Sequence, residues 1–548
     1  MPVLKFPEGR LESLTGLSRR ELEDVLFRLK CEVDYLDDGY VEVEVNPDRP
    51  DMYVGEGIAR AVGGLLGRRR GWSLPRIVDS GLVLYNEGPP TRPYIAAAVV
   101  YNVNVTEDYI EELVQFQEKL HDTIGRRRRK AAIGLHDLSK LPSGKLYYKL
   151  ASYEDEMIPL GHPGERTPLK RALEETSQGR KYGSLSATDN GHPALYSGSD
   201  IIAIPPVINS EITRVEPGTR DLFIDVTGTD KATVEKVLDI ITTTLAEREG
   251  AYLGKVKVIR ESVEEATPKL SAKTVFLGKD EPSRILGLPL DSFTISDGLS
   301  RMLHNVDVSA GGFRVEAPPF RVDILSSIDL VEDIAIAIGY ESIGENKPVV
   351  DRQGRLQALT LLARKVRDLA IGLGYTETMQ LTLTSPRLLD LTGFTSRVEV
   401  ENPVQQEYSV LRPSLIPSLL STLSRNLHAR KPVKVFEVGN VVVPGTPPPD
   451  EVRLGLAIMD EEVGYEDIQA SVYSILRLLN VEFSVEPYKH KVFVEGRAAR
   501  IISRGTLLGV MGEVNPEVLL ALGIDYPVAA AELNLEVIAE WRSKTESP

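Results

Sequence analysis

The segment RVDILSSIDLVEDIAIAIGY, residues 321–340, concentrates negative charge at the start of an apolar run. Its four carboxylates are Asp323, Asp329, Glu332 and Asp333. The last three stand at positions i, i+3 and i+4, so a helix would place them on one face. Asp323 lies on the preceding segment and could fold over the helix start. The pattern predicts a buried helix that begins in a group of acidic side chains.

Two interpretations of this acidic group are open from the residues alone. Several carboxylates without Cys or His suit a hard cation, and Mg²⁺ would bind one or more of them while keeping waters. Alternatively, Ser326 or Ser327 caps the helix, and the acidic residues of the first turn complement its dipole. Taken by themselves, the residues favour capping over a metal site.

Length and composition bound the remaining possibilities. A chain of 548 residues should form several domains. The net charge of −16 argues against a surface covered by nucleic acid but allows a local basic groove. The single cysteine, Cys31, excludes a disulfide framework and a Cys-rich metal site. No apolar run reaches the roughly 20 residues of a membrane span, and the first residues lack signal-peptide features. We therefore expect a cytoplasmic protein without membrane contact.

Periodicity and turn signals predict a multidomain chain of α/β and α+β units. A helix capped by Ser18, a strand at 40–45 and a helix capped by Asp51 indicate a first small α/β domain. The next region mixes strands with helices, one of which should start at Asp230. A winged-helix-sized unit follows, and a long helix ending near Gly374 opens a strand-rich last unit. The expected boundaries are 1–88, 89–262, 268–346 and 352–548.

The sequence FRVDILSSIDLVEDIAIAIGYESI, residues 320–343, resembles the β subunit of phenylalanyl-tRNA synthetase of the archaeal and eukaryotic type. Segments that resemble the same family occur in the same order at 45–67, 119–141, 205–230, 410–442 and 509–524. The resemblance covers nearly the whole chain. It implies that Asp323, Asp329, Glu332 and Asp333 bind a magnesium ion near a catalytic α subunit, and this shifts the balance towards the metal interpretation.

The resemblance also implies the fold and role of each unit. It predicts an N-terminal α/β domain, an editing domain, a winged-helix-like domain and a class II synthetase-like antiparallel sheet. Catalytic domains of that class bind ATP phosphates through arginines, whose forked guanidinium pairs phosphate oxygens. Here Phe436 and Glu437 adjoin without an intervening Arg, and no Arg follows Gly509 and Gly512. We expect residues 352–548 to be a scaffold, with ATP-dependent charging of tRNA(Phe) on the α subunit of an (αβ)₂ heterotetramer.

The chemistry expected of this chain is hydrolysis of mischarged Tyr-tRNA(Phe). An apolar pocket rejects an added hydroxyl only about 10²-fold, so a second, hydrolytic site is useful. The family places that site between residues 90 and 260, and no nucleophile with an adjacent base is evident, which points to a positioned water. The candidates are the polar residues that follow strands: Asn209, Ser210, Glu211, Asp225, Thr227 and Thr229. Capping by Asn209 or Ser210, and solvent exposure of Asp225 or Thr227, are the simpler alternatives.

The basic run GRRRRK, residues 125–130, lies in the same region, between His121 and His136. Its cations Arg126, Arg127, Arg128, Arg129 and Lys130 are candidates for contact with the tRNA 3′ end, and such contact should depend on salt. The alternative is an ordinary solvated surface. Two rival functions remain: a scaffold subunit that no longer edits, and a magnesium-binding winged-helix protein that binds nucleic acid. The single Arg in SDGLSRMLHNV, residues 296–306, weakens the latter.

Overall fold

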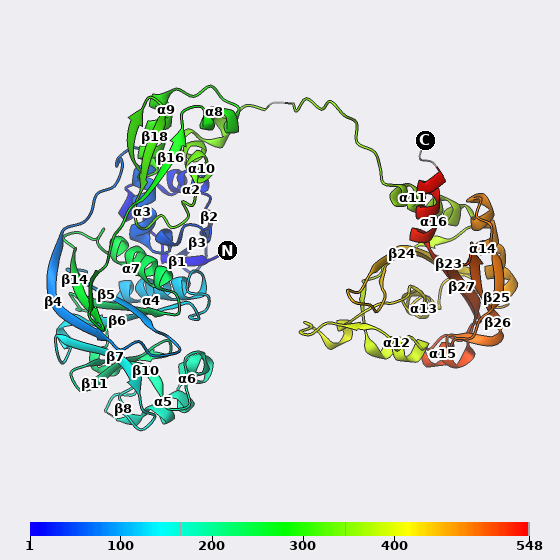
Figure 1. Cartoon of the computed structure of the whole chain (residues 1–548), viewed down its shortest axis with the longest axis horizontal. Coiled ribbons are helices and arrows are strands. Elements are labelled where there is room, and N and C mark those ends of the chain that lie inside the picture. Colours follow the sequence, from blue (N-terminus) through cyan, green and yellow to red (C-terminus); the bar gives the residue numbers. More distant parts are fainter. Residues whose placement is uncertain (165, 346, 546–548) are drawn as a thin grey trace. The chain divides into compact units, whose positions relative to one another are not determined.

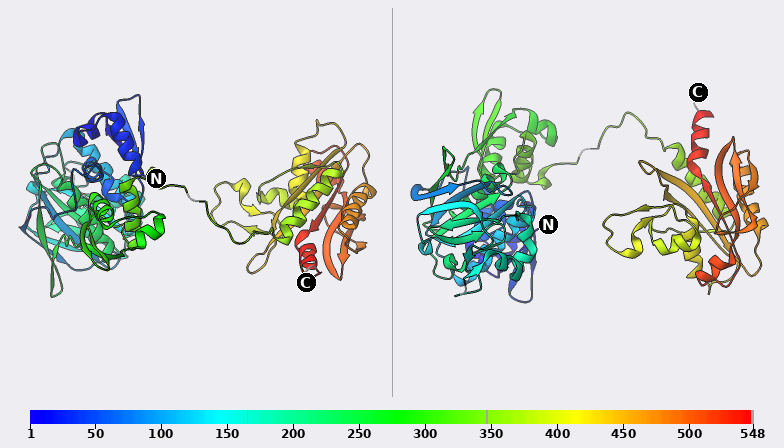
Figure 2. Two further views of the ribbon diagram at one scale, coloured as in Figure 1. Left: turned by 90° about the horizontal axis from the view of Figure 1, so that it is seen from above. Right: turned by 60° about the horizontal axis from the view of Figure 1, so that its bottom comes forward.

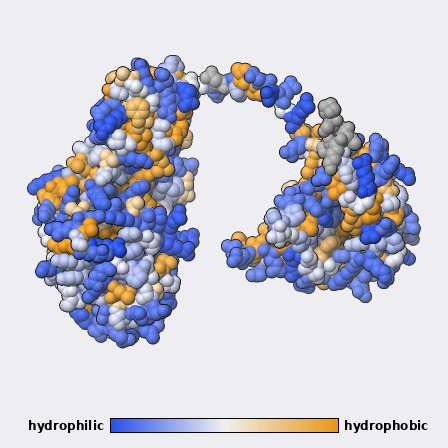
Figure 3. All heavy atoms as spheres, in the orientation of Figure 1, coloured by the Kyte–Doolittle hydropathy of each residue, from blue (hydrophilic) through white to orange (hydrophobic). Residues whose placement is uncertain are grey.

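The computed structural model describes residues 1–164, 166–345 and 347–545, and the chain divides into two compact units, Met1–Lys347 and Pro348–Pro548 (Figure 1). Within the described residues, no helix is both long and apolar enough to cross a membrane. On the face shown in Figure 3, hydrophilic residues predominate on both units, with hydrophobic residues scattered among them.

The first unit opens with a small antiparallel sheet and three helices. The sheet has the order β1-β3-β2 and packs its buried face with the first helices. Ser18 forms the predicted cap, as a capping box with Glu21. The prediction for Asp51 is wrong, because the helix starts at Gly55 and Asp51 is instead buried between Arg49 and Arg60. The elements are β1 (Val3–Pro7), α1 (Arg10–Thr15), α2 (Arg19–Arg28), β2 (Glu32–Tyr35), β3 (Tyr40–Glu44), η1 (Pro50–Met52) and α3 (Gly55–Leu65).

A ten-stranded sheet forms the centre of the first unit. Its order is β12-β11-β10-β7-β4-β14-β5-β13-β6, with β15 paired to β14, and β4 runs parallel to both of its neighbours. The strands are β4 (Ile77–Asn86), β5 (Tyr94–Tyr101), β6 (Ala131–Asp137), β7 (Lys145–Ala151), β10 (His192–Ser197), β11 (Asp200–Ile204), β12 (Ile208–Asn209), β13 (Leu222–Gly228), β14 (Tyr252–Arg260) and β15 (Val263–Thr267). Strand β4 lies within the expected first domain, 1–88, and pairs in this sheet with β14 and β7.

Helices cover the sheet on the side of β5, β13 and β6. Helix α7 (Lys231–Leu245) packs on β5 and β13, and α4 (Glu107–Asp122) contacts β6 (Figures 1 and 2). Asp230 caps α7 as predicted, accepting a hydrogen bond from Thr233 N. A smaller group of elements packs beside β10 and β11: β8 (Glu156–Met157), β9 (Thr167–Pro168), α5 (Leu169–Glu175) and α6 (Ser177–Tyr182). Three short 3₁₀ turns complete this part: η2 (Leu138–Lys140), η3 (Gly183–Leu185) and η4 (Glu211–Thr213).

The end of the first unit is a three-stranded sheet packed against helices. The order is β16-β18-β17, and the buried faces of α9 and α10 close the core. The sequence predicts helices near 281–287 and 296–303, and the structure has them at Glu281–Leu286 and Ser292–Arg301. The elements are β16 (Lys273–Gly278), α8 (Glu281–Leu286), α9 (Ser292–Arg301), β17 (Asn305–Ser309), β18 (Gly312–Ala317), α10 (Ser327–Ile338) and η5 (Tyr340–Ser342).

The second unit is built on a seven-stranded sheet with a core on each face. The order is β19-β23-β24-β28-β27-β26-β25, antiparallel except for the pair β19–β23. Helices α11, α14 and α16 pack on one face and α13 on the other. The main elements are α11 (Ala358–Gly372), β19 (Thr376–Glu377), α13 (Ile416–Ser424), β23 (Val433–Val442), β24 (Asp450–Met459), α14 (Tyr465–Leu478), β25 (Ser484–Pro487), β26 (Phe493–Ser503), β27 (Thr506–Val514), β28 (Val528–Asn534) and α16 (Leu535–Thr545).

Smaller elements of this unit flank that sheet. They are β20 (Leu383–Thr384), α12 (Pro386–Thr392), β21 (Val398–Glu399), η6 (Gln406–Tyr408), β22 (Val410–Leu411) and α15 (Pro516–Ala521).

Two strands of this sheet differ from what the sequence indicates. The alternating segments KVFVEG (491–496) and AARIIS (498–503) predict two separate strands, but both belong to the single strand β26, whose register shifts between Phe493 and Ala498. Strand β28 had no sequence prediction, because its run of small residues, Ala529–Ala531, has low strand propensity. In the sheet it lies between the long strands β24 and β27, so its residues are buried although their small side chains do not predict a strand.

Candidate functional site

A cavity in the first unit gathers two of the predicted editing residues with one of the predicted RNA contacts. It has a volume of about 230 Å³ and is lined by Asn209, Asp225 and Arg128. Strand pairing brings some of these residues together. Asp225 on β13 lies opposite Gly134 on β6, and Asn209 is the last residue of β12. The other polar or sterically important lining residues are Gln117, Glu118, Gly134, Gln178 and the Pro205–Pro206 pair.

Asp225 is held at the cavity wall by a buried histidine. Its carboxylate is 1% exposed, and Oδ1 lies 2.9 Å from His136 Nε2. His136 Nδ1 in turn lies 2.7 Å from Thr213 Oγ1. Because a carboxylate only accepts, Nε2 carries a proton and donates it to Asp225; in the neutral ring Nδ1 then accepts from the Thr213 hydroxyl. Within the described residues no hydrogen bond engages Oδ2 of Asp225, so this oxygen remains an acceptor for a bound molecule.

Gly134 gives the Asp225–His136 pair the space it needs. A Cβ at this position would lie 2.2 Å from Asp225 Oδ1 and 2.9 Å from His136 Nε2. Both distances are too short for a carbon beside these atoms, so a side chain here would displace the pair. Asn209 on β12 donates from Nδ2 to Leu135 O on β6, at 3.0 Å, and this bond joins the two strands that end the sheet order.

The other four predicted editing residues do not line this cavity. Ser210 is the N-cap of η4, and its hydroxyl donates to Ile158 O. Glu211 accepts from Gly161 N and pairs with Arg214. Thr227 is buried on β13, whereas Thr229 is exposed at the end of that strand. The capping alternative therefore holds for Ser210, while solvent exposure was the wrong alternative for Asp225 and Thr227.

Arg92 is a further buried residue of this region that sequence reasoning missed. Its side chain is fully buried, and Nε and Nη2 both donate to Thr227, to Oγ1 and to the carbonyl oxygen, each at 2.9 Å. Burial lowers the pKa of Arg92 to about 10. The two residues are 135 positions apart in the chain, so no local sequence pattern predicts their contact.

The basic run forms a left-handed turn at the mouth of the cavity. Arg126, Arg127 and Arg128 have φ values of 49°, 53° and 63°, a conformation that costs about 1–2 kcal/mol for each non-glycine residue. The Arg128 side chain anchors the turn, because Nη1 donates to Pro206 O and Val207 O and Nη2 donates to Glu118 Oε1. Its guanidinium also lies over the Tyr182 ring, 4.3 Å from the centroid. Arg128 is therefore a wall of the cavity rather than a free surface cation.

The remaining cations of the run are placed differently. Arg126, Arg127 and Arg129 are exposed, and no carboxylate pairs with them within the described residues. Lys130 lies 3.4 Å from Asp230 at the start of α7. The three exposed arginines thus form a small cationic surface beside the cavity, suited to phosphate.

Glu118 and His121 secure the base of this turn. His121 is buried, its Nε2 accepts from Ile133 N at 2.7 Å, and Nδ1 lies 3.0 Å from Glu118 Oε1. Because Nε2 accepts from Ile133 N, the ring is neutral and Nδ1 carries the proton that it donates to Glu118; burial lowers the pKa of His121 in the same direction. Burial would raise the pKa of Glu118, but the His121 hydrogen bond and the Arg128 charge outweigh it and lower that pKa to about 2.

The acidic start of α10 does not gather its four carboxylates into one group. Asp329 completes a capping box with Ser326 and accepts from the backbone N of Leu325 and Ser326, at 2.8 and 2.7 Å. Glu332 pairs with Lys30, 2.9 Å away. The capping interpretation therefore describes Asp329.

Asp323 and Asp333 share an internal cation. Arg321 Nη2 lies 2.7 Å from Asp323 Oδ2 and 2.8 Å from Asp333 Oδ2, and His304 Nε2 lies 2.6 Å from the latter atom. Burial would raise the pKa of Asp333, but the Arg321 charge holds it well below its usual range. In the part of the chain that the structure describes, no group of three or more His, Cys, Asp or Glu residues is placed to hold a metal ion. These four residues do not fit a magnesium site in this arrangement, because a guanidinium occupies the place between Asp323 and Asp333.

The sheet of the second unit presents no free arginine on its described strands. Arg453 pairs with Glu532, Arg497 with Glu513 and Arg500 with Glu486. At the position where Phe436 and Glu437 adjoin, Glu437 is buried against Arg412, at 2.6 Å. Arg412 and Arg453 are held by the buried carboxylates of Glu437 and Glu532, whereas Arg497 and Arg500 form solvent-exposed pairs.

Two family profiles identify the class of protein. Residues 275–340 match the family described as "tRNA synthetase B5 domain". Residues 343–535 match the family described as "Phenylalanyl tRNA synthetase beta chain CLM domain". The B5 match lies at the end of the first unit, and the CLM match covers most of the second. The chain is therefore an aminoacyl-tRNA synthetase protein.

Full-length relatives narrow this class to one family. The chain is 55% identical over 548 residues to "Phenylalanine--tRNA ligase beta subunit" of Aeropyrum pernix, covering 100% of both chains. It is 40% identical over 552 residues to the protein of the same name in Saccharolobus solfataricus, covering 99% and 100%. A crystal structure of an N-terminal fragment of the Pyrococcus horikoshii phenylalanyl-tRNA synthetase beta subunit matches with TM-score 0.59 and 34% identity, covering 62% of this chain and all of the fragment. The chain belongs to the phenylalanine–tRNA ligase beta subunits.

Proposed function

We propose that this beta subunit hydrolyses Tyr-tRNA(Phe) in the cavity formed by Asp225, Asn209 and Arg128. As a member of its family the chain is part of the ligase that charges tRNA(Phe) with phenylalanine. The observation that carries the proposal is the convergence of Asp225 and Asn209 on one cavity beside a cationic turn. The chain works with an α subunit, in an (αβ)₂ heterotetramer in the cytoplasm.

Asp225 supplies selectivity in this proposal. Its Oδ2 accepts a hydrogen bond from the tyrosyl hydroxyl, and phenylalanine would leave that buried acceptor unpaired, which costs about 1–3 kcal/mol. His136 and Thr213 hold the carboxylate in place. The ester is attacked by a positioned water, since the cavity residues include no nucleophile paired with a base.

The exposed arginines bring the substrate to the cavity. Arg126, Arg127 and Arg129 contact phosphates near the tRNA 3′ end, while Arg128 keeps the turn in its left-handed conformation. The second unit serves as a class II synthetase-like scaffold, because its sheet arginines are all paired with carboxylates. Phenylalanyl-adenylate forms on the α subunit from phenylalanine and magnesium-bound ATP. The acidic residues at the start of α10 take no part in this reaction.

Deacylation assays on the assembled enzyme test this function. Tyr-tRNA(Phe) and Phe-tRNA(Phe) are incubated with wild-type enzyme, with Asp225→Asn and with Glu211→Gln. The last is a matched control, because Glu211 is a polar residue of the same region that does not line the cavity. Selective loss of tyrosine in wild type and Glu211→Gln, but not in Asp225→Asn, supports the proposal. Equal, slow decay of both esters in an enzyme that still charges phenylalanine would make the chain a scaffold and tRNA platform.

A further inference from the structure

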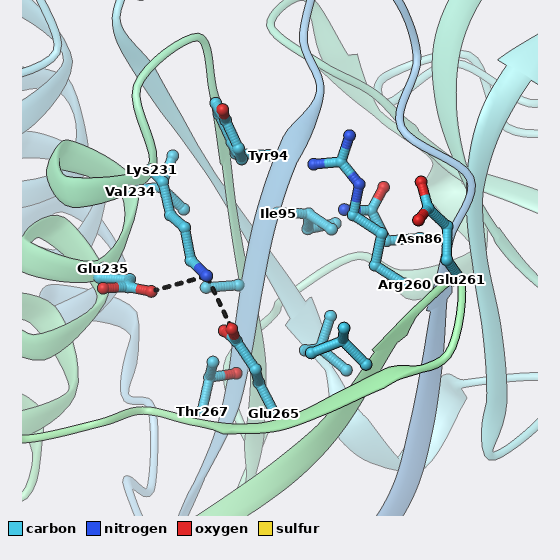
Figure 4. Close-up of a pocket in the computed structure, with 13 residues that line it drawn as sticks. Asn86, Tyr94, Ile95, Lys231, Val234, Glu235, Arg260, Glu261, Glu265 and Thr267 are labelled. Atoms are coloured by element: carbon cyan, nitrogen blue, oxygen red, sulfur yellow. Dashed lines mark hydrogen bonds and ion pairs between the residues drawn. The ribbon is translucent and has the colours of Figure 1, made fainter.

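A second cavity of about 230 Å³ lies in the same unit and shares no lining residue with the first. It opens between the first turns of α7 and the hairpin of β14 and β15 (Figure 4). Ile95 on β5, Val234 on α7, and Val258 and Val263 on the hairpin give it an apolar interior. A cavity of this size and composition suits one small apolar molecule.

Most polar groups around this cavity already have partners. Lys231 Nζ lies 2.7 Å from Glu265 Oε1, and Glu235 Oε1 lies 2.7 Å from Lys269 Nζ. Asn86 donates to Pro93 O and accepts from Gly88 N. These groups shape the walls but leave little capacity for a ligand.

Arg260 and Glu261 are the two charged residues lining the cavity that have no ion pair or side-chain hydrogen bond within the described chain. Glu261 is exposed, whereas the Arg260 side chain is partly buried and lies beside the Tyr94 ring, whose centre is 5.6 Å away. Figure 4 shows Lys231 joined to Glu235 and Glu265, whereas Arg260 stands across the cavity beside Asn86 with no such link. A guanidinium without a carboxylate partner can donate two parallel hydrogen bonds to an anion.

The surrounding charge limits that anion to a single negative charge. Two cationic side chains, Lys231 and Arg260, face three carboxylates, Glu235, Glu261 and Glu265. A phosphate ester carries close to two negative charges and would be repelled by this lining. A carboxylate carries one, which the Arg260 guanidinium can neutralise with two hydrogen bonds. We propose that this cavity is a second small-molecule site that binds a compact apolar monocarboxylate, its carboxylate on Arg260 and its body on Ile95, Val234 and Val258.

The proposal is independent of the editing function, although Ile95 pairs with Thr227 across β5 and β13. The test is calorimetric titration of the full chain with 4-methylpentanoate, which carries one carboxylate and no aromatic ring. Arg260→Gln should weaken binding by about tenfold or more, because a charge-assisted hydrogen bond is removed. Arg260→Lys, which keeps the charge but not the fork, should fall between the two. Arg284→Gln, an exposed arginine on α8, is the matched control and should bind as wild type does.

Three ligand variants complete the test. We expect 4-methylpentanamide and 4-methylpentylamine to bind much more weakly than the acid, and 3-methylbutyl phosphate to bind no better than it. Equal affinity of wild type and Arg260→Gln, tighter binding of the amine or the phosphate, or no saturable binding of 4-methylpentanoate would each overturn the proposal. Because none of these readouts involves tRNA, failure here leaves the editing assays unaffected.

Discussion

Replacing Gly134 by alanine would place a methyl group where the structure has the Asp225–His136 hydrogen bond. The new Cβ would lie 2.2 Å from Asp225 Oδ1 and 2.9 Å from His136 Nε2. These atoms lie on buried strands, so the carboxylate has to turn away or the strands have to separate. Loss of one hydrogen bond to a charged group costs about 1.5–3 kcal/mol, and overpacking costs a similar amount.

The expected result is a selective defect in editing. If Asp225 Oδ2 orients the substrate, a loss of that size lowers kcat/KM for Tyr-tRNA(Phe) hydrolysis about ten- to hundredfold. Charging of phenylalanine, which takes place on the α subunit, should not change. Thermal unfolding of the purified chain should shift downward by a few degrees, since buried strands are perturbed.

Gly144→Ala is the matched control for this prediction. An added Cβ there meets only Leu82 Cδ2, at 3.5 Å, which is an ordinary contact. Editing and unfolding of this variant should resemble wild type. Wild-type editing by Gly134→Ala, with an unchanged unfolding temperature, would refute the placement of Asp225 and His136. Equal loss of editing and phenylalanine charging would instead indicate general misfolding.

Three further predictions concern RNA binding and stability. Changing Arg126, Arg127 and Arg129 to Gln should weaken tRNA binding. The slope of log affinity against log salt concentration should decrease in magnitude by about 0.7 for each phosphate that the protein no longer neutralises. An unaltered slope would mean that these arginines are ordinary solvated surface residues. Asp329→Ala should lower the free energy of unfolding by about 1 kcal/mol through loss of the capping box. Magnesium should not stabilise wild type more than this variant, and a magnesium effect confined to wild type would reinstate the metal site. Burial raises the pKa of Asp239 from its ordinary 3.8 to about 7. Because the folded state keeps this proton when the unfolded state has lost it, stability should fall as pH rises from the ordinary carboxyl range to about 7 and then level off. Asp239→Asn should remove that fall, and an identical pH profile in both proteins would contradict it.

Helix starts were the most predictable features of this chain. Ser18, Asp230 and Ser326 cap the helices expected from their positions, because a cap involves only residues within one turn. Asp51 shows the limit of that reasoning. It has the composition of a cap, but Arg49 and Arg60 bind it in the interior, and the helix begins elsewhere.

Sequence spacing was also insufficient to predict the roles of the acidic residues at 323–333 and the basic residues at 126–130. Both were recognised as clusters of charge, yet their partners come from distant parts of the chain. Arg321 and His304 surround Asp333, and Lys30 takes Glu332. Arg128 turns inward to Glu118 and the Pro206 carbonyl, which separates it from the neighbouring arginines. Electrostatic partners at such sequence separations cannot be read from spacing.

The editing candidates divide along the same line. The family resemblance placed them between residues 90 and 260, their position after strands selected them within that region, and Asp225 and Asn209 line one cavity. Their supports could not be found in that way. His136 and Gly134 reach Asp225 only through the pairing of β6 with β13, and Arg92 reaches Thr227 from 135 residues away.

The family, the local helix and strand elements, and the absence of arginines at two positions of the last sheet could all be predicted from the chain's residues. These properties depend on residue identity and on spacing within a few turns. Folding in three dimensions sets which carboxylate lines a cavity, which one caps a helix and which one neutralises an arginine. Each of those roles depends on burial and on partners that strand pairing and packing bring together from far along the chain.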